Sequence, residues 1–179
     1  MRITQHWKFE DIKIIDLFSA LDYRGEFIKI YNDNIYRKLG INMDIRESFY
    51  SLSHKNVIRG LHFQMPPHAH NKLVHVIHGS VLDVVVDLRK QSSYYKKAVS
   101  IELTDKEPRA IYIPQGFAHG FKSLEDNTLI LYNVSKGYEK VSDFGVRWDT
   151  IEFNWGIENP IVSERDNSFI SLEDFDSPF

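Results

Sequence analysis

Short strand-like runs at regular spacing constrain the fold of this chain more than any other feature. Residues 72–78 and 81–88 are rich in Val, Ile and Leu, and a Gly-Ser pair separates them, which predicts a β-hairpin. Further runs of this kind cover residues 98–103, 110–113 and 128–134. Helical periodicity occurs only at residues 33–39 and after Ser163. We therefore expect an all-β jelly-roll barrel with a few short helices at its periphery.

Length and charge predict one globular domain over residues 1–179. A chain of 179 residues with 42% hydrophobic side chains can form one core and hardly two. Its net charge of -3 does not favour nucleic-acid binding, which requires clustered cations. No apolar run approaches the roughly 20 residues of a membrane helix. The first residues also lack the apolar core of a signal peptide, so we expect a cytoplasmic protein without a membrane or nucleic-acid partner.

Several common chemistries lack their sequence support. The chain contains no GxGxxG, GxxxxGK[ST] or GxSxG motif, the usual signs of dinucleotide binding, P-loop phosphoryl transfer and serine hydrolysis. It also has no cysteine, which excludes disulfides and Cys-ligated metal sites. We therefore expect an activity that uses no bound cofactor.

Polar groups concentrate in three segments, and the first contains a candidate general base. The segments are residues 59–72, 113–121 and 163–166. His62 and Gln64 share one face if the first segment is extended. Histidine is a suitable base because its unperturbed pKa lies in the working range. It needs a carboxylate to hold its tautomer, and Asp83 and Asp166 are both candidates. The alternative is a structural histidine, since the chain has eight.

Cationic side chains supply further candidates. Lys72 shares a face with Val74 and Val76, which we expect to form part of the barrel interior. A lysine there is partly desolvated and needs a partner or a substrate oxygen, although a strand-end lysine can also extend to solvent. The guanidinium groups of Arg24 and Arg59 suit phosphate oxygens. A lone arginine is, however, more often a member of a surface ion pair.

Four histidines invite comparison with metal-binding cupins. His68, His70, His75 and His119 resemble the ligand layout of those proteins, and imidazole binds several transition metals. The flanking glycines are at the wrong offsets, however, and His75 replaces the usual carboxylate on the face opposite to His70. We therefore predict no metal site and keep a metal-dependent cupin enzyme as an alternative.

An ordered set of motifs covers nearly the whole chain, from about Asp22 to Asp166. The motifs are Asp22-x-Arg24-Gly25-x-Phe27, Arg59-Gly60-Leu61-His62-x-Gln64, Pro66-Pro67-x-Ala69-x-x-Lys72-Leu73-Val74, Asp83-Val84-x-Val86-Asp87-Leu88-Arg89, Ile113-Pro114-x-Gly116-Phe117-Ala118-His119-Gly120-Phe121, Tyr132, Tyr138, Gly145-x-Arg147-Trp148-Asp149 and Ser163-Glu164-x-Asp166. This set resembles the dTDP-4-dehydrorhamnose 3,5-epimerase family.

The resemblance implies a metal-independent cupin that forms a homodimer, with an N-terminal strand contributed across the interface. It implies inversion of C3, C5 or both in a nucleotide-linked 4-keto-6-deoxy sugar, for surface-polysaccharide or other deoxysugar synthesis. By the same resemblance, His62 is the base oriented by Asp166, Lys72 stabilises an enolate oxygen and Tyr132 returns a proton from the opposite face. The expected substrate-binding residues are Arg24, Phe27, Glu47, Arg59, Gln64, His119 and Tyr138.

Four positions depart from the family pattern and leave the substrate open. Family members commonly carry Gln and Asn where this chain has Glu47 and Phe49, and Glu and Lys where it has Lys29 and Asn133. We expect these positions near the nucleotide and phosphate groups, where a carboxylate is unfavourable unless it faces a ribose hydroxyl or guanine. A GDP-linked hexose or heptose is therefore an alternative to a dTDP-hexose. A 3,4-ketoisomerase and a non-catalytic sugar-nucleotide-binding cupin are alternative functions.

Overall fold

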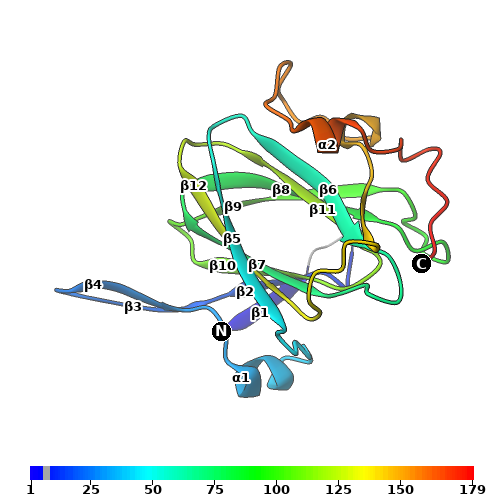
Figure 1. The fold of residues 1–179 in the computed structure, drawn as a ribbon. Helices are drawn as coiled ribbons and strands as arrows, with labels where there is room; N and C mark the ends of the chain where they lie inside the picture. Colours follow the sequence, from blue (N-terminus) through cyan, green and yellow to red (C-terminus); the bar gives the residue numbers. More distant parts are fainter. Residues whose placement is uncertain (6–8) are drawn as a thin grey trace.

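The computed structural model describes residues 1–5 and 9–179, which form two antiparallel β-sheets that face each other (Figure 1). The six-stranded sheet has the order β1 (Arg2–Gln5), β2 (Lys13–Asp16), β10 (Arg109–Ile113), β7 (Lys72–His78), β12 (Thr128–Val134) and β5 (Glu47–Ser53). The five-stranded sheet has the order β13 (Asp143–Gly145), β6 (Ile58–Gln64), β11 (Phe117–Ser123), β8 (Ser80–Asp87) and β9 (Ala98–Thr104). This architecture confirms the predicted all-β jelly roll.

Alternating side chains build the core between the sheets. Val74 and Val76 of β7 lie in this core, as their shared face predicts. On β8 both faces are buried. Val81 and Val85 belong to the same core, whereas Val84, Val86 and their neighbours pack under the C-terminal segment that includes Trp155. This burial on both sides explains the continuous apolar run of β8.

The predicted hairpin over residues 72–88 is wrong in its pairing, although both strands exist. Strand β7 pairs with β10 and β12, while β8 pairs with β9 and β11 in the other sheet. Gly79 has a φ of 81°, and a Cβ atom there would lie 2.6 Å from Thr128 Oγ1. A turn glycine thus carries the chain from one sheet to the other. The local sequence cannot distinguish this crossing from a hairpin.

Both predicted helical segments are confirmed as short peripheral helices. Helix α1 (Asp33–Lys38) is capped by Asn32, and α2 (Glu164–Asn167) by Ser163, whose hydroxyl accepts a hydrogen bond from the Asp166 amide. A 3-10 turn, η1 (Trp148–Thr150), precedes α2. Helix α2 brings Asp166 against β6, where the Gly60 amide donates to Asp166 Oδ2 at 3.0 Å. No helix among the described residues is long and apolar enough to span a membrane.

A hairpin that the sequence pattern did not indicate extends away from the barrel (Figure 1). It consists of β3 (Phe18–Asp22) and β4 (Gly25–Lys29), which pair only with each other. Several of its apolar side chains are exposed, including Leu21 at 81% and Tyr23 at 97%. A two-stranded hairpin is marginally stable by itself, so this element has no core of its own within the chain.

Candidate active site

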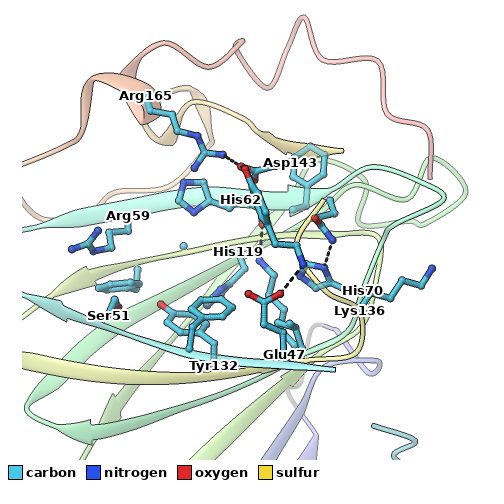
Figure 2. A pocket seen from close by; sticks show the side chains of 18 residues that line it. Glu47, Ser51, Arg59, His62, His70, His119, Tyr132, Lys136, Asp143 and Arg165 are labelled. Atoms are coloured by element: carbon cyan, nitrogen blue, oxygen red, sulfur yellow. Dashed lines mark hydrogen bonds and ion pairs between the residues drawn. The ribbon is translucent and has the colours of Figure 1, made fainter. Parts of the chain in front are cut away.

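A cavity of about 370 Å³ opens between the two sheets (Figure 2). Eight of the eleven candidate residues line it: Glu47, Arg59, His62, Gln64, Lys72, His119, Tyr132 and Tyr138. Asp166 lies behind His62 in an adjoining cavity. Arg24 and Phe27 lie on the exposed β3–β4 hairpin, and the chain does not bring them to its own cavity. The structure therefore gathers most of the predicted site from strands far apart in sequence.

His62 and Asp166 form a hydrogen-bonded pair with a defined tautomer. His62 Nε2 lies 2.8 Å from Asp166 Oδ1, and the other carboxylate oxygen accepts from the Gly60 amide. Burial alone would raise the pKa of Asp166, but the hydrogen bonds from His62 and Gly60 lower it on balance. The ionised carboxylate can only accept, so the proton sits on Nε2 and the lone pair on His62 Nδ1 is free to act as a base.

The pKa of His62 is lowered because burial disfavours the imidazolium, and the neighbouring Asp166 offsets only part of this effect. The ring is therefore neutral near pH 7 and able to accept a proton. Asp83, the other carboxylate considered as its partner, instead lies 2.8 Å from His119 Nε2. His119 and Asp83 are almost completely buried. This second pair holds the His119 ring in the wall of the cavity.

Tyr132 enters the cavity from the sheet opposite to His62 (Figure 2). Its side chain is 8% exposed and stacks on Phe49, with ring centroids 4.9 Å apart. Burial raises the pKa of Tyr132 above its usual value. The phenol is therefore protonated throughout the neutral range and can serve as an acid.

Lys72 supplies a cation at the start of β7. Its Nζ donates a hydrogen bond to the His62 carbonyl oxygen at 2.9 Å, which ties the ammonium group to the strand that carries His62. Burial lowers the pKa of Lys72 to about 8, although Asp83 and Asp143 favour its charged form. The group is charged at neutral pH and close to titration.

Gln64 was expected to bind substrate, but its amide is already engaged within the protein. Its Oε1 accepts from the Glu139 amide at 2.6 Å. Its Nε2 lies within hydrogen-bond distance of the His68 and Gly137 carbonyl oxygens and of His70 Nδ1. Two N–H groups therefore face three acceptors, and Gln64 orders the loop at residues 137–139.

Glu47 also positions this loop. Its Oε2 accepts from the Tyr138 amide at 2.6 Å, whereas Oε1 makes no hydrogen bond to the described residues. Arg59 is held by Ser53 Oγ and the Leu52 carbonyl. Both charged groups line the cavity, so a ligand there meets a carboxylate as well as cations.

The cavity also contains charged residues that the sequence pattern did not single out. Lys136, Asp143 and Arg165 all line it. Arg165 Nη2 lies 2.6 Å from Asp143 Oδ2, which also accepts from the Tyr138 hydroxyl at 3.2 Å. Arg165 directly precedes Asp166 in sequence, so the Ser163–Asp166 motif was the available signal for this residue.

The expectation that all four positions that differ from the family pattern lie near the nucleotide is wrong for Asn133. It follows Tyr132 on β12, so its side chain points to the opposite face, where Ser48 Oγ donates to its Oδ1 at 2.7 Å. Lys29 lies on the β3–β4 hairpin, outside the cavity of its own chain. Glu47 and Phe49 do line the cavity.

The histidines considered as metal ligands have separate partners. His70 pairs with Gln64, while His75 Nδ1 lies 2.7 Å from the Arg109 carbonyl. His68 contacts Ser142, and His119 contacts Asp83. Within residues 1–5 and 9–179, no group of three or more His, Asp or Glu side chains is arranged to hold a metal ion.

The fold and the cavity define a cupin-like enzyme equipped for proton transfer. The family model for dTDP-4-dehydrorhamnose 3,5-epimerase matches residues 6–174. The enzyme of that name from Methanothermobacter thermautotrophicus is 37% identical over 166 residues, which cover 90% of this chain and 89% of the relative. The Shigella flexneri enzyme is 36% identical over 159 residues, with 87% and 88% coverage. This chain therefore belongs to the dTDP-4-dehydrorhamnose 3,5-epimerase family, whose members are isomerases acting on nucleotide sugars.

A solved structure agrees with this assignment. The dTDP-6-deoxy-D-glucose-3,5-epimerase of Legionella pneumophila, in complex with dTDP-4-keto-L-rhamnose, superposes with a TM-score of 0.91 at 30% identity. The match covers 98% of this chain and 94% of that one. The likeness therefore extends over nearly the whole of both chains.

Proposed function

We propose that this chain inverts both C3 and C5 of a nucleoside-diphosphate-linked 4-keto-6-deoxy sugar. The observation that carries the proposal is the entry of His62 and Tyr132 into one cavity from opposite sheets. A ketone at C4 acidifies the hydrogens on both neighbouring carbons. Inversion requires removal of a proton from one face and its return to the other, which a base and an acid on opposite walls can provide.

Each inversion balances as one deprotonation and one reprotonation. His62 Nδ1 takes the proton from carbon, and Asp166 stabilises the resulting imidazolium. The electron pair of the broken C–H bond moves to the C4 oxygen as an enolate, which the Lys72 ammonium stabilises. The enolate then takes the Tyr132 hydroxyl proton on the opposite face of the carbon. Proton exchange with solvent resets both groups.

Replacing Tyr132 with phenylalanine separates the two halves of this reaction. The variant should still exchange the C3 and C5 protons with solvent, because His62 remains, while inversion should fall by about 100-fold or more. Proton NMR in D2O measures exchange, and product analysis measures inversion on the same sample. Equal losses of exchange and inversion would argue against an acid role for Tyr132.

The nucleotide is the second part of the proposal. The curated relatives are named for dTDP-linked substrates, which supports a dTDP-hexose. Glu47 favours a second candidate, a GDP-linked hexose or heptose, because the free Oε1 can accept hydrogen bonds from guanine. From the family alone, we propose that the product serves cytoplasmic synthesis of deoxysugars or surface polysaccharides.

Incubation in D2O with dTDP- and GDP-linked 4-keto-6-deoxy sugars tests both parts. Exchange at C3 and C5 with inverted product is the expected result. The nucleotide sugar that reacts faster identifies the preferred nucleotide. Exchange at C3 alone would reduce the activity to a 3-epimerase. Movement of the carbonyl to another carbon would establish a ketoisomerase instead.

A Glu47→Gln variant tests the nucleotide assignment. Glutamine keeps an oxygen for the Tyr138 amide and removes the negative charge from the cavity wall. The ratio of kcat/KM for GDP- and dTDP-linked donors should shift about 10-fold toward dTDP. An unchanged ratio would refute the placement of Glu47 beside the nucleobase of the substrate. Glu139→Gln, which alters a residue not among those lining the cavity, is the matched control.

We further propose that residues 1–179 act as one domain that forms a homodimer through the β3–β4 hairpin. Apolar side chains are exposed on this hairpin, such as Leu21 and Phe27, and on the edge strand β5, such as Tyr50. Their burial against a second copy would stabilise an element that lacks its own core. It would also supply Arg24 and Phe27 to the partner's cavity.

Mixing two inactive variants tests this arrangement. In a heterodimer of His62→Ala and Arg24→Ala chains, one site receives His62 from one chain and Arg24 from the other. Activity should therefore recover to about a quarter of wild type after the chains are mixed and re-equilibrated. Sedimentation analysis should give twice the chain mass. A dimer without recovery would show that Arg24 acts within its own chain or not at all.

A further inference from the structure

The hydrogen bonds around Gln64 determine which nitrogen of His70 carries a proton. The Glu139 backbone N–H can only donate, so the Gln64 atom 2.6 Å from it must be the carbonyl Oε1. The other end of the amide is then the NH2 group, which lies 2.9 Å from His70 Nδ1. His70 Nδ1 is consequently an acceptor without a proton, and His70 Nε2 carries the hydrogen.

His70 Nε2–H is a donor without a partner among the described residues. The half-buried ring lines the cavity, and Nε2 is not among the fully buried atoms that lack hydrogen bonds. It is therefore accessible from the cavity, and Figure 2 shows the ring at the same end of the cavity as Glu47 and Lys136. Burial, together with the positive charges of Lys72 and Lys136, lowers the pKa of His70 to about 3, although the nearby His68 backbone carbonyl favours its charged form. The ring remains a neutral donor at every working pH.

The position of His70 relative to Lys72 indicates what it contacts. Lys72 Nζ donates to the His62 carbonyl, and two residues further along β6 the Gln64 amide donates to His70. His70 is thus the next donor along the same wall, about 7 Å of extended chain from Lys72. From this position, the His70 Nε2–H can reach a sugar whose keto oxygen is held by Lys72, and it would meet a different oxygen of that sugar.

We propose that His70 is a specificity-determining residue whose Nε2–H binds the C2 or the C3 hydroxyl oxygen of the sugar whose keto group Lys72 holds. Gln64 acts as its positioning residue by fixing the tautomer. The assignment rests on the proposed epimerase function and deepens it. It predicts discrimination between sugars that carry this hydroxyl and sugars that lack it.

The test combines two variants with substrate analogues. His70→Phe removes the donor, whereas His70→Gln can accept from Gln64 and still donate into the cavity. His78→Gln, at a histidine outside the cavity, is the control. Each protein is assayed with the parent nucleotide-linked 4-keto sugar and with analogues lacking the C2 or the C3 hydroxyl.

His70→Phe should lower kcat/KM for the parent sugar about 10-fold, mainly through KM, and His70→Gln should restore most of it. For one of the two analogues, the kcat/KM of the wild type should be about 10-fold lower than for the parent sugar. His70→Phe should not lower the kcat/KM for that analogue any further. If His70→Phe lowers kcat/KM for both analogues by the same factor as for the parent sugar, His70 does not contact either hydroxyl and the proposal is overturned. If no parent nucleotide-linked 4-keto sugar is turned over, the epimerase function is overturned, and this proposal with it. A protonated Nδ1 in the 15N NMR spectrum of His70 would also overturn it.

Discussion

Replacement of His62 by alanine should abolish exchange of both the C3 and the C5 protons, with a loss of kcat of about 1,000-fold or more. A positioned general base contributes about 100- to 10,000-fold, and the Asp166 carboxylate holds His62 in the tautomer that leaves Nδ1 free at the cavity. Both exchanges should fail together, because one base serves both carbons. NMR in D2O measures the two rates in one sample.

Asp166→Asn is the informative companion to His62→Ala. The asparagine NH2 group can donate to His62 Nε2, which would move the ring proton to Nδ1 and block the nitrogen that acts as the base. Activity should therefore fall by a large factor even though the hydrogen bond and the fold persist. Burial lowers the pKa of His62, so kcat/KM of the wild type should fall only at a pH below the ordinary titration range of histidine, as the ring becomes protonated. Unchanged exchange in His62→Ala would remove it as the base.

The sequence predicted the fold well where a local rule decides it. Alternation along β7 and β8 identified the strands and the buried faces, because side chains in a strand alternate between its two sides. Pairing was not predicted correctly, since Gly79 permits both a hairpin and a crossing between sheets. Strand β11 was missed because Gly116 and Gly120 weaken the strand pattern. Gly120 is required there because a Cβ would lie 2.6 Å from the Arg59 carbonyl.

In the site, too, the features that depend on neighbouring residues were predicted, whereas the contacts between residues far apart in sequence were not. The shared face of His62 and Gln64 follows from the period of the strand, yet the partner of His62 lies 104 residues away. Spacing alone could not choose Asp166 over Asp83, and only the family resemblance favoured it. Gln64 matched the family motif but is fully engaged within the protein, which depends on the backbone of a distant loop. The contact between Asp143 and Arg165 also joins segments that no local pattern connects.

Lys72→Met should lower kcat by about 100- to 1,000-fold, the usual effect of removing one donor from a developing oxyanion. Exchange and inversion should fall together, unlike in Tyr132→Phe, because both steps pass through the enolate. Methionine keeps the length and apolar packing of the side chain, so folding should survive. Retention of exchange at the wild-type rate would show that Lys72 does not contact the enolate.

The pH dependence of Lys72 gives the same role an independent test. Burial lowers its pKa to about 8, so the ammonium is present below that pH and is lost above it. The kcat/KM of the free enzyme should therefore decline as the pH rises through about 8. Tyr132 cannot cause this decline, because its pKa is raised and it remains protonated. In Lys72→Arg the guanidinium stays charged, so the decline should disappear even if the rate is lower. Its persistence would assign the alkaline limb to another group. In the bound complex the diphosphate and the enolate favour the ammonium, so the decline in kcat should lie at a higher pH than the decline in kcat/KM.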